Sequence, residues 1–266
     1  MCIRDRDIDM QEARRVYDSP SKGVLWGWEV TAYVWTKSIA TGTFLMMAVW
    51  SWLNGGINPA SGMNAVLTSL VFIGITGALL VKDLDRPDRF LYVLLRPQWK
   101  SWLVRGAYII LGFGSLITIK LFDFYFRWEL SWLMIPGAIL AILGAVYTAF
   151  LFGQARGRDL WQSTGLSSLH MLIHAVMAGS VTMMVIAPET SAWMANVLLW
   201  GIFLNMCIIA KEILKPHDTP DTKKAIYLMT KGYYSKYFWA GIVFGNIVPI
   251  VMINNYADII TLIAGG

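Results

Sequence analysis

Seven long apolar runs, nearly free of Asp, Glu, Lys and Arg, dominate this sequence of 266 residues. An apolar helix needs roughly 20 residues to cross a hydrocarbon core of roughly 30 Å. Every backbone N–H and C=O must be paired in lipid, and barrel strands are much shorter than these runs. The pattern predicts an all-α, polytopic transmembrane helical bundle with seven full helices, at 30–53, 63–81, 102–122, 131–152, 166–187, 193–210 and 237–254.

The composition and the short loops predict one membrane domain and no separate soluble domain. The chain is 56% hydrophobic and 15% charged, far from the balance of a soluble protein. We expect a cytoplasmic N-terminal tail at 1–29 and an integral membrane domain at 30–266. The residues after Asn255 begin another apolar run, which predicts a truncated eighth helix or, as the alternative, a short interfacial helix. Cys2 and Cys207 lie too far apart in sequence to indicate a disulfide framework or a metal site.

The basic residues predict the orientation of the bundle. Of the 22 Lys and Arg residues, 18 fall in the N-terminal tail and in the loops 82–101, 153–165 and 211–236, which share one side of the membrane. The segments on the other side carry Arg127 alone. Because basic loops stay in the cytoplasm, the N-terminus is expected inside, in a multi-pass protein of a prokaryotic cytoplasmic (inner) membrane. The high pI is thus a signal of topology, and no basic soluble surface indicates nucleic-acid binding.

Loop 82–101 carries a motif that resembles a known family. Residues 82–90 read Lys-Asp-Leu-Asp-Arg-Pro-Asp-Arg-Phe, similar to the Asp-Leu-Gly-Arg-Pro-x-Arg-Phe signature of the NrfD/polysulfide reductase membrane subunits. Asp85 stands where that family usually has Gly. The start of the first run and the Thr230-Lys231-Gly232 segment also fit, so the resemblance extends from about residue 26 to 254.

The resemblance implies an eight-helix membrane anchor that binds quinone (menaquinone or ubiquinone) and has no haem or iron–sulfur cluster of its own. Such a subunit holds a ferredoxin-like iron–sulfur subunit, often with a molybdopterin-type catalytic subunit beyond it, and electrons pass between the quinone pool and the iron–sulfur chain. Many relatives hold their partners on the outer side, whereas the charge bias places the matching face of this chain inside. The similar openings of loops 82–101 and 211–236 (Lys82-Asp83, Lys211-Glu212) suggest two four-helix halves, although cytoplasmic loops are basic in any case.

Ionisable residues inside a membrane are costly, so each is a candidate for function. Glu29, Tyr33 and Lys37 are spaced i, i+4, i+8 and form one stripe on the first helix. Lys37 either extends to the cytoplasmic interface or faces the bundle, paired with a carboxylate and bonded to a quinone carbonyl.

Two histidines and a tyrosine lie at a similar predicted depth. His170 and His174 share one face of the fifth helix, and an imidazole suits proton transfer to a reduced quinone oxygen, although a structural role is the alternative for at least one of them. Tyr147, near the cytoplasmic end of the fourth helix, matches the position of a tyrosine near the quinone in the family. We therefore predict one quinone-binding site that comprises Glu29, Tyr33, Lys37, Tyr147, His170 and His174.

The motif loop is the predicted docking surface for the partner subunit, with Asp83, Arg86, Arg89 and Arg96 as its candidate residues. Contact with anionic lipid headgroups is the alternative role for these cations. A secondary transporter is the alternative function, in which Asn205 and Asn246 would supply polar groups within the helices. A haem-bearing cytochrome is disfavoured, because His170 and His174 on one helix cannot ligate opposite faces of one haem.

The charge distribution predicts the outcome of a topology experiment. Reporter fusions at Pro59 and Pro220 are expected to report opposite sides of the membrane, with Pro220 in the cytoplasm. Paired activity reporters, one active only inside and one only outside, make the measurement. The reverse pattern would move the basic face, and with it the partner surface, to the outside.

Overall fold

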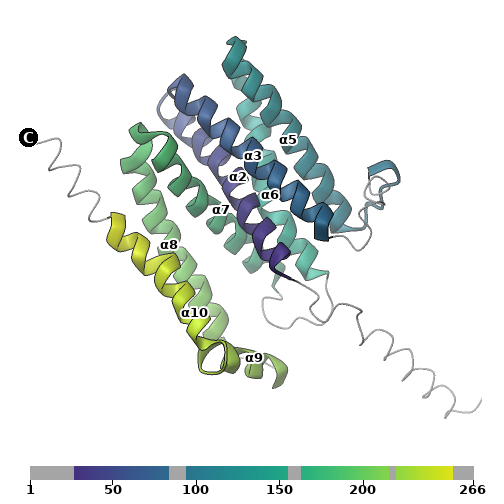
Figure 1. Cartoon of the computed structure of the whole chain (residues 1–266), viewed down its shortest axis with the longest axis vertical. Helices are drawn as coiled ribbons and strands as arrows, with labels where there is room; N and C mark the ends of the chain where they lie inside the picture. The colour runs from purple at the N-terminus through teal and green to yellow at the C-terminus, as the bar shows by residue number, and fades with distance from the viewer. Residues whose placement is uncertain (1–26, 84–93, 155–162, 216–219, 254–266) are drawn as a thin grey trace, which may run out of the picture.

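The computed structural model describes residues 27–83, 94–154, 163–215 and 220–253, and all regular structure in them is helical (Figure 1). This confirms the predicted all-α class. The helices are α2 (Trp28–Leu53), α3 (Pro59–Asp83), α5 (Trp102–Phe126), α6 (Met134–Gly153), α7 (Thr164–Ile186), α8 (Ser191–Leu214), α9 (Pro220–Thr230) and α10 (Ser235–Ile242). After α10 the chain makes a π-helical segment, Val243–Ile247, and stays helical to Ile253.

The predicted count of seven full apolar helices is not exact. Six helical segments of the described chain have the length and hydropathy to cross a membrane: 59–83, 102–126, 131–153, 164–186, 188–214 and 235–253. Helix α2 is 26 residues long but is not among them, because Lys37 and several Thr and Ser residues make it more polar. A helix surrounded by other helices tolerates this polarity, and α2 is buried along most of its length.

The division into two four-helix halves is not exact either. Helix α2 packs against α3, α6 and α7, while α7 packs against α2, α6 and α8. Figure 1 shows α8 and α10 on one side of α7, and α3 and α5 on the other. Because α7 joins both groups, no boundary between independent halves runs through the described bundle. The predicted eighth helix lies outside the described residues.

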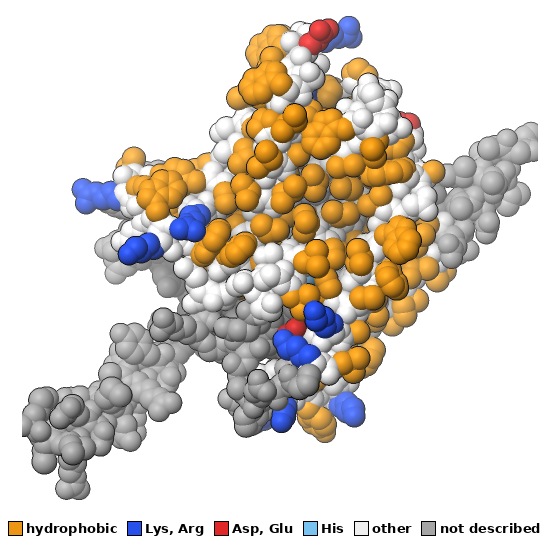
Figure 2. Space-filling model, turned by 180° about the vertical axis from the view of Figure 1, so that it is seen from behind, with side chains coloured by type: hydrophobic (Ala, Val, Ile, Leu, Met, Phe, Trp, Pro, Cys, Tyr) orange, Lys and Arg blue, Asp and Glu red, His pale blue; other side chains and the backbone are white. Residues whose placement is uncertain are grey.

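The outer surface of the bundle is apolar, as lipid contact requires. Figure 2 shows hydrophobic side chains covering the middle of one face, with Lys and Arg side chains along its lower and left-hand edges and also at its upper end. Many large apolar side chains are exposed on the helices, among them Val71, Leu111, Ile139, Val185 and Phe203. Together with the six candidate spans, this surface identifies a multi-pass membrane protein.

A buried ion pair closes the turn between α5 and α6. Lys120 Nζ lies 2.5 Å from Asp123 Oδ2, and the other oxygen of Asp123 accepts a hydrogen bond from the Leu130 N–H at 2.9 Å. In the turn between Asp123 and Leu130, Arg127 and Glu129 adopt left-handed backbone conformations. Both carboxylate oxygens of Asp123 therefore serve to hold this turn.

Helices α2 and α7 approach each other at glycines. A Cβ added at Gly42 would lie 2.7 Å from the carbonyl carbon of Ala175, and one added at Gly179 would lie 2.8 Å from the Cα of Gly42. Small residues allow this kind of close backbone contact between membrane helices. The contact fixes α7 against the central helix and thereby places the histidines of α7 relative to α2.

Alanine substitution at this crossing is expected to destabilise the bundle. Gly42→Ala and Gly179→Ala each insert a methyl group into backbone, so each should cost about 1–3 kcal/mol or more and lower the thermal unfolding midpoint of the purified protein. Gly114→Ala on α5 is the matched control, since its Cβ would meet nothing within 4 Å. Equal midpoints for all three variants would contradict the close approach.

Candidate functional site

The Lys37 side chain is fully buried and points toward α6. Its Nζ donates a hydrogen bond to the Ala145 carbonyl at 3.0 Å and another to the Thr148 hydroxyl, and it lies 4.7 Å from the centre of the Tyr147 ring. Lys37 has no solvent exposure, so of the two predicted alternatives the one in which it extends to the interface is wrong. Within the described residues its partners are a carbonyl, a hydroxyl and an aromatic ring, and not the predicted carboxylate.

Tyr147 completes this cluster from the side of α6. The residue is 2% exposed, and its ring packs on Gly106 of α5, where an added Cβ would overlap the ring. Its hydroxyl has no hydrogen-bond partner in the described part of the chain. Tyr33 is also buried, one turn before Lys37 on the same stripe of α2. We call Tyr33, Lys37, Tyr147 and Thr148 the lysine cluster.

Glu29 lies at the end of the bundle, away from this cluster. Its carboxylate is 3.7 Å from Lys82 Nζ, and Lys82 in turn lies over the Trp28 ring, 4.5 Å from the ring centre. The pair joins the start of α2 to the end of α3. Glu29 therefore pairs with Lys82 and not with Lys37, although the two residues share the predicted stripe of α2.

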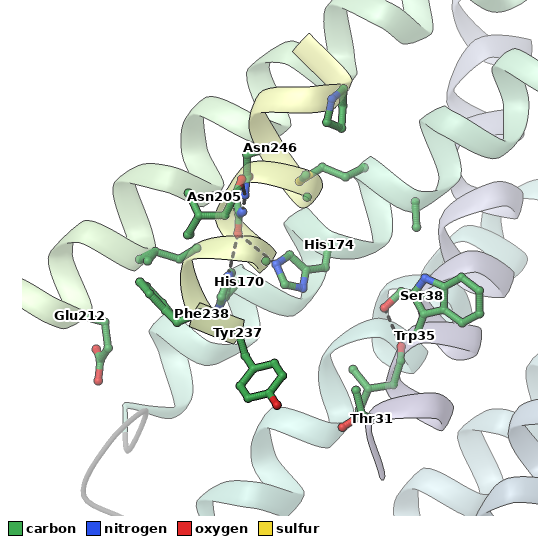
Figure 3. Close-up of a pocket in the computed structure, with 18 of the residues that line it drawn as sticks. Thr31, Trp35, Ser38, His170, His174, Asn205, Glu212, Tyr237, Phe238 and Asn246 are labelled. Atoms are coloured by element: carbon green, nitrogen blue, oxygen red, sulfur yellow. Dashed lines mark hydrogen bonds between the residues drawn. The ribbon is translucent and has the colours of Figure 1, made fainter. Parts of the chain in front are cut away.

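His170 and His174 of α7 meet at a single asparagine of α8. Their Nε2 atoms lie 2.8 and 2.9 Å from Asn205 Oδ1, and the two rings are 4.3 Å apart between centres. The Asn205 amide donates to Asn246 Oδ1 at 2.8 Å, and the Asn246 amide donates to the Ile242 carbonyl at 3.3 Å. Three helical segments thus join in one hydrogen-bond network, shown in Figure 3. We call these four side chains the histidine network.

The histidine network lines a groove of about 750 Å³ between α2, α7, α8 and α10. The walls are mainly apolar, with Trp35, Met177, Leu198 and Phe238 among the lining residues. Figure 3 shows the network on one side of the groove, with Trp35 and Ser38 of α2 facing it from the other. The groove has the character of a ligand site, which is usually apolar with a few convergent polar groups.

Apart from Glu29, which lies at the end of the bundle, the predicted site residues therefore fall into two groups. Helix α2 turns Tyr33 and Lys37 toward α6, whereas its residues Thr31, Val34, Trp35 and Ser38 line the groove on a different face. The prediction of one converging site assumed that equal depth meant proximity. Depth follows from position along a helix, but the direction of a side chain around the helix axis depends on packing. The roles of the lysine cluster and of the histidine network in quinone binding stay predictions.

The docking residues are only partly described. Asp83 is the last residue of α3, and Arg96 is exposed on the segment before α5. Two hydrogen bonds connect this segment to α5: the Tyr108 hydroxyl donates to the Leu94 carbonyl, and Arg105 Nε donates to the Trp99 carbonyl. Arg86 and Arg89, together with most of the motif, lie outside the described residues. The role of these four residues stays a prediction.

The sequence analysis did not place Asn205, Asn246 or Glu212 in this site. The two asparagines were recognised as polar groups within helices, but only as features of a transporter. Glu212 was assigned to a loop, whereas it lies on α8, is 1% exposed, pairs with Lys215 at 3.0 Å and lines the groove. Its spacing of seven residues from Asn205, about two helical turns, was the signal that would have placed both on one face.

The fold and the groove define a polytopic membrane protein with a polar site between its helices. The family model described as polysulphide reductase, NrfD, matches residues 18–261, and the chain belongs to this family. A comparison with curated proteins found no match. Membership of this family, together with the membrane-spanning helices, is consistent with a membrane anchor of a redox complex.

The lysine cluster predicts a specific loss of stability. Thr148→Val removes one acceptor from a buried ammonium group and should cost about 1–3 kcal/mol, because an unsatisfied buried donor bears its full desolvation penalty. Thr118→Val on α5 is the matched control, since that hydroxyl donates only to the Gly114 carbonyl of its own helix. Thermal unfolding in detergent compares the two, and equal midpoints would show that the Thr148 hydroxyl does not stabilise Lys37.

Proposed function

We propose that this chain is the membrane anchor and quinone-interacting subunit of a respiratory oxidoreductase complex. It exchanges electrons between the quinone pool and an iron–sulfur partner subunit. Family membership supports the anchor, and the observation that carries the quinone site is the groove with His170 and His174 in its wall.

The groove fits a quinone headgroup in size and chemistry. Its volume of about 750 Å³ lies within the range of roughly 300–1,000 Å³ that is usual for small-molecule sites. At 1.5 Å per residue, His170 and His174 lie roughly 9 and 15 Å from the start of α7. A headgroup at this depth bonds to the imidazoles, and its isoprenoid tail stays among the apolar walls and the lipid.

The histidines supply the groups that quinone chemistry needs from a protein. Reduction of a quinone takes up two electrons and two protons, and oxidation of the hydroquinone releases them. A ring nitrogen of histidine exchanges protons near neutral pH, so the imidazoles hold the ligand oxygen and accept or donate its proton. Electrons leave to or arrive from the iron–sulfur partner, because the chain is proposed to have neither haem nor iron–sulfur cluster of its own.

The lysine cluster is a second candidate position for the headgroup. The unpaired hydroxyl of Tyr147 and the buried ammonium of Lys37 are hydrogen-bond donors that a quinone carbonyl would satisfy. The groove is the first choice because its lining residues include both histidines and none of Tyr33, Lys37 and Tyr147.

The partner is proposed to dock on the basic face. Arg96, Lys100, Lys223 and Lys224 are exposed, and complementary charge steers and orients an acidic partner. The positive-inside rule places this face in the cytoplasm. An iron–sulfur subunit bound there lies at the end of the bundle where α7 begins. From that end, His170 and His174 lie within the first three turns of α7.

A transporter is the second candidate function, favoured by the π-helical segment Val243–Ile247 that follows α10 and contains Asn246. Transporters use broken helices near the membrane midplane to bind their substrates. Here, however, Asn205 and Asn246 bond to each other and to the histidines, so their amides are already paired.

Substitution of the groove histidine is expected to slow quinol-linked turnover without loss of assembly. His174→Ala removes one hydrogen bond to the ligand, worth about 0.5–1.5 kcal/mol between neutral groups, which lowers ligand affinity by up to about tenfold. Turnover of the native complex with a soluble quinol is measured beside Asn196→Ala, a change on α8 outside the groove. Lys37→Ala tests the other position: loss of turnover in Lys37→Ala alone would move the site to the lysine cluster.

Affinity purification from the native membrane separates the anchor from the transporter. An anchor is expected to bring down an iron–sulfur protein in stoichiometric amount, and Arg96→Glu combined with Lys100→Glu should weaken that association at moderate salt. Recovery of the chain alone, under conditions that preserve a known membrane complex from the same cells, would favour the transporter.

A further inference from the structure

The hydrogen bonds of the histidine network run in one direction only. A backbone carbonyl has no proton to give, so the contact between Ile242 O and Asn246 requires the amide N–H of Asn246 as the donor. The carbonyl oxygen of the Asn246 side chain then faces Asn205 and accepts from its amide. This leaves Asn205 Oδ1 facing the two imidazoles, where it accepts from both. Reversal of either asparagine would place oxygen against oxygen or N–H against N–H.

This direction fixes the tautomer of the histidines. An oxygen that accepts from both Nε2 atoms requires a proton on each of them, and its two lone pairs are sufficient for two donors. In a neutral imidazole the other nitrogen, Nδ1, then carries no proton and is an acceptor. One backbone carbonyl, that of Ile242, therefore determines the direction of every hydrogen bond in the network. It orients Asn246, which orients Asn205, and Asn205 in turn determines which ring nitrogens beside the groove carry a proton.

We propose that Asn205 is a positioning residue that holds His170 and His174 as Nε2–H tautomers, so that His174 offers Nδ1 to the groove as a hydrogen-bond acceptor. A groove with this acceptor binds a ligand through a hydroxyl rather than through a carbonyl. In terms of the proposed function, on which this second statement rests, the groove prefers the hydroquinone to the quinone.

The surroundings of the network agree with this assignment. Figure 3 shows the His174 ring between Asn205 and the side of the groove formed by α2. There, the Ser38 hydroxyl donates to the Val34 carbonyl of its own helix at 2.8 Å. The buried Glu212 carboxylate is paired with Lys215 and lies further along α8. Within the described residues, Asn205 is the hydrogen-bond partner that the structure gives to His174.

The tautomers are measured directly by ¹⁵N spectroscopy of the full chain in lipid bilayers. The chain has three histidines, so labelling of histidine ring nitrogens gives few signals, and a His217→Asn variant removes the signals of the third. The expected spectrum at neutral pH shows both remaining rings with Nε2 protonated and Nδ1 bare. A proton on Nδ1 of either ring would overturn the proposal.

Variants of the two asparagines test the direction of the network. Asn246→Leu removes the acceptor that orients Asn205, and a mixture of tautomers is expected. Asn246→Asp keeps an oxygen facing the Asn205 amide and should restore the single tautomer, which a general loss of packing would not do. Asn205→Leu is expected to give the same mixture. Asn196→Leu is the matched control on α8, since its side chain donates to the Ala192 carbonyl of its own helix.

Ligand preference is measured with menadione and its hydroquinone as probes. The hydroquinone is expected to bind about tenfold more tightly than menadione, equivalent to about 1.4 kcal/mol, and Asn205→Leu should bring the ratio near one. If the spectra show the predicted tautomers but neither probe binds, the positioning role of Asn205 stands and the quinone site is refuted. Binding of the probes with Nδ1–H imidazoles would refute the positioning role and leave the proposed function standing.

Discussion

A helix that carries a lysine and several hydroxyl groups in its middle must be surrounded by other helices to be stable in a membrane. Helix α2 meets this requirement by packing against α3, α6 and α7. The cost of burying Lys37 is offset by the Ala145 carbonyl, the Thr148 hydroxyl and the Tyr147 ring. On another side the hydroxyls of Thr36 and Thr76 bond at 2.8 Å and join α2 to α3. The arrangement of the bundle follows from the need to pair these groups.

The glycine contact between α2 and α7 connects this central helix to the groove. Because Gly42 and Gly179 carry no side chain, the two backbones touch, and α7 lies directly against α2. The histidines of α7 then face α8 and α10, away from Lys37. Stability and function are linked at this point, since a change that separates α2 from α7 would also widen the groove that both helices line.

The proposed quinone site depends on few protein groups beyond the two histidines. Asn205 and Asn246 contact no ligand in the proposed arrangement, yet they determine which ring nitrogen carries the proton. Their anchor is a backbone carbonyl in the turn that precedes the π-helical segment, and such segments occur often at functional sites. The interruption of α10 thus has a physical role in the proposed function, because it presents Asn246 to Asn205.

The sequence by itself determined the class of the protein and the approximate bounds of its apolar helices, because length and hydropathy in lipid leave few alternatives. The family was indicated separately, by the resemblance of the motif in loop 82–101. The sequence also placed His170 and His174 on one face of a helix, since spacing along one helix is a local property. Only the tertiary structure decided that Lys37 faces α6 while the histidines face Asn205. The direction of a side chain toward a neighbouring helix depends on packing between segments far apart in sequence, and no local pattern in the chain specifies it.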